Sequence, residues 1–380
     1  MIHIISINFL LAIATTIAMT ILPLLTTEKL GLSVFVYGMI EGGSELLSNI
    51  FRLVSGSLFD RIKNKKYIFI SATIVAFFSK IILFTSSAFG ILGSKVLERL
   101  SNGLFGAPRD AFVGQATKNK GIGLALLSCS KTLGCVSGPL LVSGLVYFAG
   151  GLESQIFKII LVATAMAAIS IVLSFFLKTK SFTMEESTKS FLLSRVSKIA
   201  KRLSPVLLIA FLFFLGRFND GMIILYLKSQ GLPEWFYLST IGFFNLTMFI
   251  VSPVIGILID NSKVKFVLYL TILSLISFNI FSYLVPYHHM LFSSLSLVAW
   301  GVQRVGAQIT FTALIFKNIS SRFYGTAIGI YSILSGLGNF ISSSICGHLA
   351  GINYEYVFLF SGSFGLICLL CSASFARKIL

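Results

Sequence analysis

The stretch Gly56-Ser-Leu-Phe-Asp60-Arg61-Ile-Lys-Asn-Lys65 decides the fold, because a related stretch returns 200 residues later. There the sequence reads Gly256-Ile-Leu-Ile-Asp260-Asn-Ser-Lys-Val-Lys265. Shared glycines or leucines are common by chance in an apolar chain. A Gly-x-Leu-x-Asp-x-x-Lys-x-Lys frame at this separation is much less so. The repeat therefore predicts two related halves.

The composition places these halves in a membrane. Of the 380 residues, 56% are hydrophobic and 11% are charged, whereas soluble domains carry roughly 25% charged residues. The formal net charge of +17 alone is compatible with nucleic-acid binding, but the apolar excess is not. Long unbroken apolar runs also exclude a β-barrel. We expect an all-α integral membrane protein.

Breaks between the apolar runs predict twelve spans of about 20 residues or more. The first apolar run begins at the N-terminus, lacks a basic leader and is interpreted as a retained span. One long polar connection, 178–204, separates an N-terminal bundle (1–177) from a C-terminal bundle (205–380). The expected spans are 6–26, 33–58, 67–88, 90–113, 121–148, 156–177, 205–228, 233–259, 265–285, 289–316, 324–348 and 354–376.

The basic residues predict the orientation. Nineteen of the 30 lysines and arginines lie in one set of alternate loops, and three lie in the other set. Positively charged loops stay in the cytoplasm, so both termini are expected there. The eight remaining basic residues fall within predicted spans: Arg52, Lys80, Lys95, Arg99, Arg109, Lys131, Arg217 and Arg304.

Four segments resemble the major facilitator superfamily of secondary transporters. The stretch 56–66 is similar to that family's loop between spans two and three. The stretch 98–111, with Pro-Arg-Asp-Ala at its end, resembles the fourth span of one bacterial branch. Gly134-x-x-x-Gly138-Pro139 is similar to the fifth-span motif common in antiporters, and 325–331 resembles the branch's eleventh span. The resemblance implies two six-helix bundles related by pseudo-two-fold symmetry, alternating access, and a bacterial inner membrane.

The resemblance also implies roles for the loop and fifth-span motifs. A cytoplasmic gate is expected from Gly56, Asp60, Arg61, Arg109, Asp110, Gly256 and Asp260, with the two glycines allowing close helix approach. The alternative is that the basic loop residues only set the topology. In the fifth span, Pro139 removes a backbone hydrogen bond. Gly134 and Gly138 serve either helix packing alone or the conformational change.

Ionisable groups within spans are costly and point to function. Glu41 and Glu45 lie one helical turn apart, and two like charges there discourage joint ionisation. They are the first candidates for proton coupling. Glu98 and Asp220 come second, because nearby cations should keep their carboxylates ionised. Lys80 is expected to be paired or to reach towards the interface.

The resemblance implies that spans one, four, seven and ten line the substrate cavity, and three of these carry an arginine. Cavity candidates are Arg99, Asn102, Lys131, Arg217, Asn219, Asn245, Arg304 and Gln308. Asn102 and Lys131 depart from the branch pattern, so the branch does not supply the substrate. The alternative for Arg217 is pairing with Asp220, three residues along the same predicted helix. The phenylalanines of spans seven and eight serve either a drug pocket or helix packing: Phe211, Phe213, Phe214, Phe243 and Phe244.

The predicted function is secondary active transport of a small molecule, coupled to protons and directed towards export. The alternative is ion-coupled uptake of an organic anion, because buried basic residues outnumber buried acidic ones. The expected partners are the substrate, the coupling ion and the bilayer, and the protein is expected to be a monomer. Neither a cofactor, a metal site nor an enzymatic activity is predicted. A channel is disfavoured because the repeated loop carboxylates indicate a moving gate.

Overall fold

The chain is helical throughout the part that the computed structural model describes, namely residues 2–61, 66–116, 120–177, 193–319 and 324–379. No strand occurs in these ranges. Within them, the side chains of 52–61, 107, 110–111, 113–116, 120–125, 193–198, 324–326 and 375–379 are outside the description.

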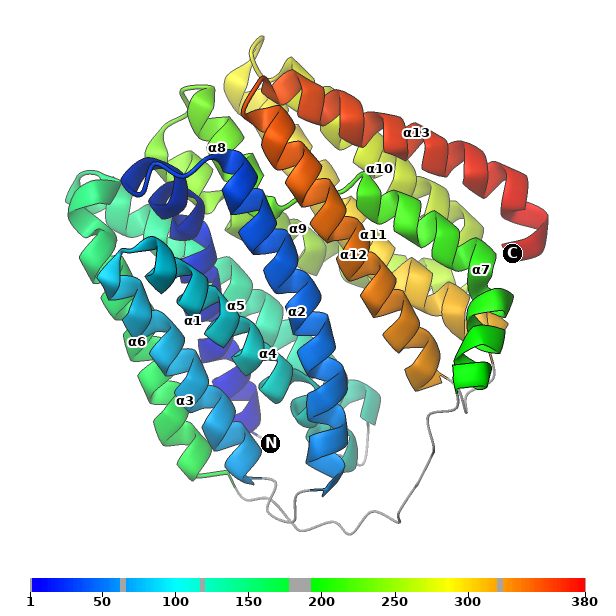
Figure 1. Ribbon diagram of the computed structural model, residues 1–380, viewed down its shortest axis with the longest axis horizontal. Coiled ribbons are helices and arrows are strands. Elements are labelled where there is room, and N and C mark those ends of the chain that lie inside the picture. Colours follow the sequence, from blue (N-terminus) through cyan, green and yellow to red (C-terminus); the bar gives the residue numbers. More distant parts are fainter. Residues whose placement is uncertain (1, 62–65, 117–119, 178–192, 320–323, 380) are drawn as a thin grey trace. The chain divides into compact units, whose positions relative to one another are not determined.

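The elements of the first half are α1 (Ile2–Leu24), the π-helical turn η1 (Leu25–Lys29), α2 (Val34–Arg61), α3 (Lys66–Ile82), the 3-10 turn η2 (Leu83–Thr85), α4 (Ala88–Ala116), α5 (Lys120–Ala149) and α6 (Leu152–Phe175). Those of the second half are α7 (Leu193–Leu215), α8 (Asp220–Ser229), α9 (Glu234–Asp260), α10 (Val264–Leu284), α11 (His289–Asn318), α12 (Tyr324–Ala350) and α13 (Tyr354–Ile379), as Figure 1 shows.

The described helices make twelve membrane-length segments when α7 and α8 are counted as one interrupted segment. This confirms the predicted all-α fold. Nine segments of the described chain are long and apolar enough to cross a membrane. The other three, α2, α4 and α11, have 28, 29 and 30 residues but are more polar. Two of these three polar helices carry the candidate site.

The turn between α3 and α4 is as short as the sequence predicts. After η2, Ser86 adopts a left-handed backbone conformation with φ of 46°. The Ser87 hydroxyl then accepts a hydrogen bond from the Gly90 N–H at 3.0 Å. This bond caps the first turn of α4, where backbone N–H groups have no partner within the helix.

The predicted seventh span, 205–228, lies within a candidate span at Ile199–Ser229, but its helical structure differs from the expectation in two respects. Helical structure begins at Leu193, inside the predicted linker, and it is interrupted at residues 216–219. The interruption frees backbone groups, which need partners in an apolar medium. The Gly216 N–H bonds to the Leu212 and Phe213 carbonyls, and the Ser361 hydroxyl donates to the Gly216 carbonyl. These bonds stabilise the break between α7 and α8. The sequence does not reveal this break because the residues on both sides of it are apolar.

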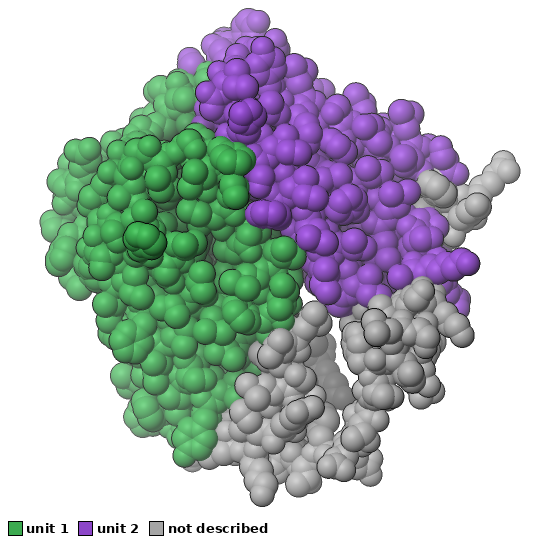
Figure 2. Space-filling model, in the orientation of Figure 1, with its two compact units in different colours: residues 1–185, 220–246 green, residues 186–219, 247–380 purple. Residues whose placement is uncertain are grey.

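The chain forms two compact units (Figure 2). Unit 1 comprises 1–185 and 220–246, and unit 2 comprises 186–219 and 247–380. Unit 1 thus contains α1–α6, α8 and the first part of α9, while unit 2 contains α7, the rest of α9 and α10–α13. One boundary falls at the break between α7 and α8. The expected division into 1–177 and 205–380 stays a prediction.

Candidate functional site

A chain of buried ion pairs joins α2, α3 and α4 within unit 1. Glu41 lies on α2, Lys80 on α3, and Lys95, Glu98 and Arg99 on α4; we call these five residues the charge cluster. Lys95 Nζ lies 2.6 Å from Glu41 Oε1 and 3.8 Å from Glu98 Oε1. Lys80 pairs with Glu98 Oε2. The cluster therefore alternates cations and carboxylates across three helices.

The geometry of α4 creates this arrangement. Residues three and four positions apart share one face of a helix, so Lys95, Glu98 and Arg99 project together. α4 packs on both α2 and α3, and the Ser101 hydroxyl on α4 donates to the Ala72 carbonyl on α3 at 2.8 Å. Each charge on α4 consequently meets an opposite charge from a neighbouring helix. The pairing expected for Lys80 is confirmed.

Arg99 is the exposed end of the charge cluster. Its side chain is 14% exposed, against 1–3% for the other four members. Arg99 Nε donates to Ser44 Oγ at 3.2 Å, and Nη2 donates to Glu41 Oε2 at 3.4 Å. Sequence reasoning missed Ser44. Its position three residues after Glu41 was the signal, because that spacing places it on the same face of α2.

The structure changes the argument for proton coupling. The sequence favours Glu41 and Glu45 because two like charges one turn apart discourage joint ionisation, and it ranks Glu98 and Asp220 second because nearby cations should keep them ionised. Nearby cations do not distinguish Glu98 from Glu41, since Lys95 and Arg99 both pair with Glu41. The like-charge argument for Glu41 and Glu45 stays a prediction. Glu45 is half-buried and interacts with Arg99 at longer range. Among the described residues, Glu45 has no ion pair within 4 Å.

The Lys80→Met variant tests how strongly the ion pairs hold the three helices. It leaves one oxygen of the buried Glu98 carboxylate without its cation, which costs about 3–5 kcal/mol of unfolding free energy. Unfolding in detergent measures this loss. The double variant Lys80→Met/Glu98→Gln should recover part of it. The control is Lys265→Met, at an exposed position on α10; equal stability of the two single variants would contradict the expectation.

Tyr37 connects the charge cluster to the start of α8. Its side chain is 1% exposed, and its hydroxyl lies directly against Gly221, where even a methyl group would overlap it. Tyr37 interacts electrostatically with Glu41 and with Asp220, the first residue of α8. Asp220 is 6% exposed. Tyr37 therefore links Asp220, a second-choice proton-coupling candidate, to Glu41, a first-choice candidate. Sequence reasoning missed Tyr37.

The fifth-span glycines allow close packing of α1 on α5. A Cβ on Gly134 would lie 2.6 Å from the Phe9 carbonyl oxygen, and one on Gly138 would lie 2.9 Å from that of Ile13. The packing role predicted for both glycines is confirmed. Pro139 lies inside the continuous helix α5 and is buried. A role of this motif in the conformational change stays a prediction.

The predicted gate is only partly within the described residues. The side chains at Gly56, Asp60, Arg61 and Asp110 lie outside them. Arg109 Nη1 donates to Asn8 Oδ1 at 2.6 Å, and Asn8 Nδ2 donates to the Leu127 carbonyl at 2.9 Å, which links α4, α1 and α5. Asp260 is exposed. A Cβ on Gly256 would meet no described atom within 4 Å, and the close helix approach expected there stays a prediction.

Arg217 lies in the break between α7 and α8, outside both helices. The helix face that it was expected to share with Asp220 is therefore not formed. Its guanidinium carbon lies 5.8 Å from the ring centroid of Phe214 and 5.9 Å from that of Trp300, a range in which cation–π attraction operates. Asn219 is half-buried in the same break.

The other cavity candidates fall in both units. In unit 1, Asn102 is half-buried on α4 and Lys131 is exposed on α5. Asn245 Nδ2 donates to the Ile241 carbonyl of its own helix at 2.7 Å. In unit 2, Arg304 is half-buried and Gln308 is exposed on α11. Their role in substrate binding stays a prediction.

The phenylalanines favour helix packing over a drug pocket. Phe213 and Phe214 are 0% and 6% exposed. Their ring centroids lie 5.7 Å and 6.3 Å from that of Phe311, and Tyr331 lies 6.0 Å from Phe214. Phe244 is 1% exposed, and Phe211 and Phe243 are half-buried. Rings at these distances form the core of their helix contacts.

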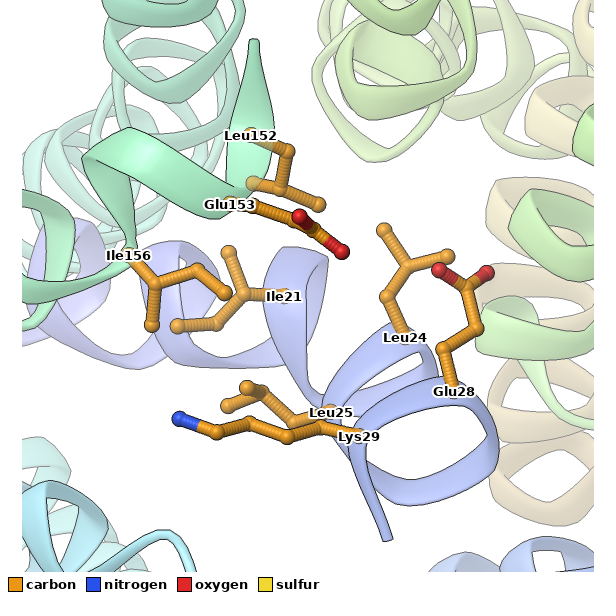
Figure 3. A pocket seen from close by; sticks show the side chains of 8 residues that line it. All are labelled: Ile21, Leu24, Leu25, Glu28, Lys29, Leu152, Glu153 and Ile156. Atoms are coloured by element: carbon orange, nitrogen blue, oxygen red, sulfur yellow. The ribbon is translucent and has the colours of Figure 1, made fainter. Parts of the chain in front are cut away.

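A pocket of about 210 Å³ lies between α1, η1 and the start of α6 (Figure 3). No predicted site residue lines it; its lining is Ile21, Leu24, Leu25, Glu28, Lys29, Leu152, Glu153 and Ile156. Glu28 of this set pairs with Lys228 at 2.5 Å. Among the described residues, no group of three or more His, Cys, Asp or Glu side chains is placed to hold a metal ion.

Comparison with known proteins gives one family and one fold. The sequence profile of the Major Facilitator Superfamily matches residues 4–343. The chain is 24% identical over 370 residues to the uncharacterized MFS-type transporter MJ1317 of Methanocaldococcus jannaschii, covering 95% of this chain and 90% of that protein. The crystal structure of the nucleoside transporter NupG superposes with a TM-score of 0.81 at 12% identity, over 98% of each chain. A POT family transporter in complex with 5-aminolevulinic acid gives 0.79 at 13% identity, over 99% of this chain and 96% of that one.

Proposed function

Because this chain belongs to the Major Facilitator Superfamily, we propose that it moves a small molecule by proton-coupled alternating access. Its family makes it a multi-pass membrane transporter and not an enzyme. The observation that carries proton coupling is the charge cluster, with the half-buried Glu45 beside it. Proton-coupling candidates remain Glu41, Glu45, Glu98 and Asp220.

Burial explains why the charge cluster supports coupling. An ionised carboxylate far from water is stable only while cations neutralise it. If a conformational change or a substrate draws Arg99 away, Glu41 loses one of its two cations. The Glu41 carboxylate can then lose its negative charge by taking up a proton. The same cluster would thus bind a proton in one state and release it in another.

Contacts at one end of unit 1 support alternating access. They connect α8 and the first turn of α9 to the first six helices. Lys228 pairs with Glu28 at 2.5 Å, and the Leu152 N–H at the start of α6 donates to Glu234 Oε2 at 2.9 Å. The Ser143 hydroxyl donates to the Trp235 carbonyl at 2.6 Å. We propose that these end contacts close the non-cytoplasmic side and must open in each cycle.

A cross-link between positions 28 and 228 tests this proposal. Glu28→Cys/Lys228→Cys would be made after replacing the five native cysteines by serine, and joined with a short cleavable thiol reagent. We expect the cross-link to stop exchange of a labelled substrate, found by thermal-shift screening, across proteoliposome membranes. Cleavage should restore exchange, because only the tether prevents opening.

The matched control is Lys29→Cys/Ser86→Cys. Lys29 Nζ donates to Ser86 Oγ at 3.1 Å, so this pair is similarly close. It joins η1 to the turn after η2, both within the first four helices, and these are expected to move together. Exchange that continues after complete 28–228 cross-linking would overturn the proposed opening.

Two directions of transport are open. Export is supported by the Gly134, Gly138 and Pro139 motif. The second candidate is uptake of an organic anion, supported by the three cations and two carboxylates of the charge cluster and by the exposure of Arg99. We place the protein in a bacterial inner membrane as a monomer with both termini cytoplasmic. Imposing pH gradients of either sign on proteoliposomes distinguishes the two directions.

A further inference from the structure

We propose that Arg99 and Ser44 form a subsite for a carboxylate group of the substrate, and that Glu41 occupies it in the substrate-free protein. This proposal rests on the transporter function proposed above and names the chemical class that its site would bind. Three independent features of the described residues carry it: access, hydrogen-bond geometry and charge.

Access singles out Arg99. The charge cluster is closed to solvent everywhere except at this side chain, which is 14% exposed. Glu41 and Lys95 are each 1% exposed. A ligand that reaches the cluster therefore meets the Arg99 side chain before it meets any other member, and the buried Ser44 hydroxyl lies within hydrogen-bond distance of Arg99 Nε.

The distances show that Glu41 lies closer to Lys95 than to Arg99. Arg99 Nη2 lies 3.4 Å from Glu41 Oε2, whereas charge-assisted hydrogen bonds are usually about 2.7–2.9 Å. Lys95 Nζ lies 2.6 Å from Glu41 Oε1. Arg99 divides its donors between Glu41 and Ser44 and does not use the two-pronged arrangement that guanidinium and carboxylate favour. An incoming carboxylate can adopt that arrangement while Glu41 keeps Lys95.

The local charge predicts how the ligand couples to protons. Facing α2 from α4 are Lys95, Glu98 and Arg99, and Tyr37, Glu41 and Glu45 lie on α2 itself. Asp220 at the start of α8 acts on Tyr37 as well. With Glu41, Glu45, Glu98 and Asp220 ionised, these carboxylates outnumber the cations Lys80, Lys95 and Arg99 by one. Another carboxylate adds one negative charge, which a proton on Glu41 or Glu45 neutralises. Anion and proton should therefore bind together, which favours uptake by cotransport over export.

The test is equilibrium binding to the full-length protein in lipid nanodiscs, without any gradient. The probe is benzoate, and the uncharged benzamide of the same shape is its comparison. We expect benzoate to bind and benzamide not to bind. Each bound anion is expected to take up one proton. Benzoate affinity should therefore fall about tenfold per pH unit at pH values where the free protein no longer carries that proton. Arg99→Gln should abolish benzoate binding, and the exposed Lys265→Gln on α10 should leave it unchanged.

Two further measurements guard against misfolding of Arg99→Gln. Ser44→Ala removes one hydroxyl and should weaken benzoate binding several-fold. The pH dependence in the unmodified protein needs no variant at all. Equal binding of benzoate and benzamide, no binding of benzoate, or undiminished binding by a folded Arg99→Gln protein would each overturn the subsite. If benzoate binds as expected but no proton-driven flux is found, the proposed transport function is contradicted and the carboxylate subsite is not.

Discussion

Proton-driven flux is expected to fall to the background rate of protein-free liposomes in the Glu41→Gln/Glu45→Gln double variant. Glutamine keeps the shape of each side chain but can neither bind nor release a proton at this site. The flux is followed with a labelled substrate, found by thermal-shift screening, after a pH gradient is imposed on proteoliposomes. Unchanged flux in the double variant would exclude both residues as proton carriers.

The single variants separate two kinds of contribution. Glu41→Gln also removes the charged partner of Lys95 and Arg99, so it is expected to lower the stability of the fold as well. Exchange of labelled for unlabelled substrate without a gradient needs a folded protein but no net proton movement, and it should persist. Glu45→Gln breaks no described ion pair and should affect only the proton-driven flux. Glu355→Gln, at an exposed position at the start of α13, is the control and should leave both rates unchanged.

The second large effect is expected at Gly134. In Gly134→Ala the new Cβ would lie 2.6 Å from the Phe9 carbonyl oxygen and 2.7 Å from the Ala12 Cβ. Neither atom ends a flexible side chain, so α1 and α5 must separate. Overpacking of this kind costs about 1–3 kcal/mol of unfolding free energy and occasionally more. Thermal unfolding in detergent measures the loss.

The same helix offers a matched control. A Cβ on Gly144 of α5 would meet no described atom within 4 Å. Gly144→Ala should therefore be neutral or stabilise the protein by roughly 0.5–1 kcal/mol, because alanine favours the helical backbone. If both alanine variants unfold at the same temperature, the close α1–α5 packing is not what these glycines provide.

The sequence was sufficient to predict the fold class. The fold class depends on local features, such as the length and apolar composition of each span, which can be seen without knowing how the spans pack. Apolar runs of about 20 residues require helices in a membrane, and the short turn near Ser86 shows a local cluster of small residues. The break at 216–219 was missed. Gly216, Asn219 and Gly221 signalled a turn, but apolar residues on both sides outweighed them. What stabilises the break, the Ser361 hydroxyl on α13, lies far along the chain.

The candidate site shows a similar limit. Spacing along α4 was enough to group Lys95 with Glu98, and burial was enough to predict a partner for Lys80. Which carboxylate pairs with which cation depends on how α2, α3 and α4 pack. The sequence therefore could not show that Glu41, and not only Glu98, is held by cations. The exposure of Arg99 also follows only from that packing.

Uphill transport is the most direct test of the central claim, that a proton gradient drives this carrier. Proteoliposomes containing the unmodified protein would receive equal concentrations of labelled substrate on both sides, followed by an imposed pH gradient. We predict accumulation on one side, collapse of this accumulation after addition of a protonophore, and none with Glu41→Gln/Glu45→Gln. Concentrations that stay equal on both sides, while labelled substrate still exchanges, would contradict the account.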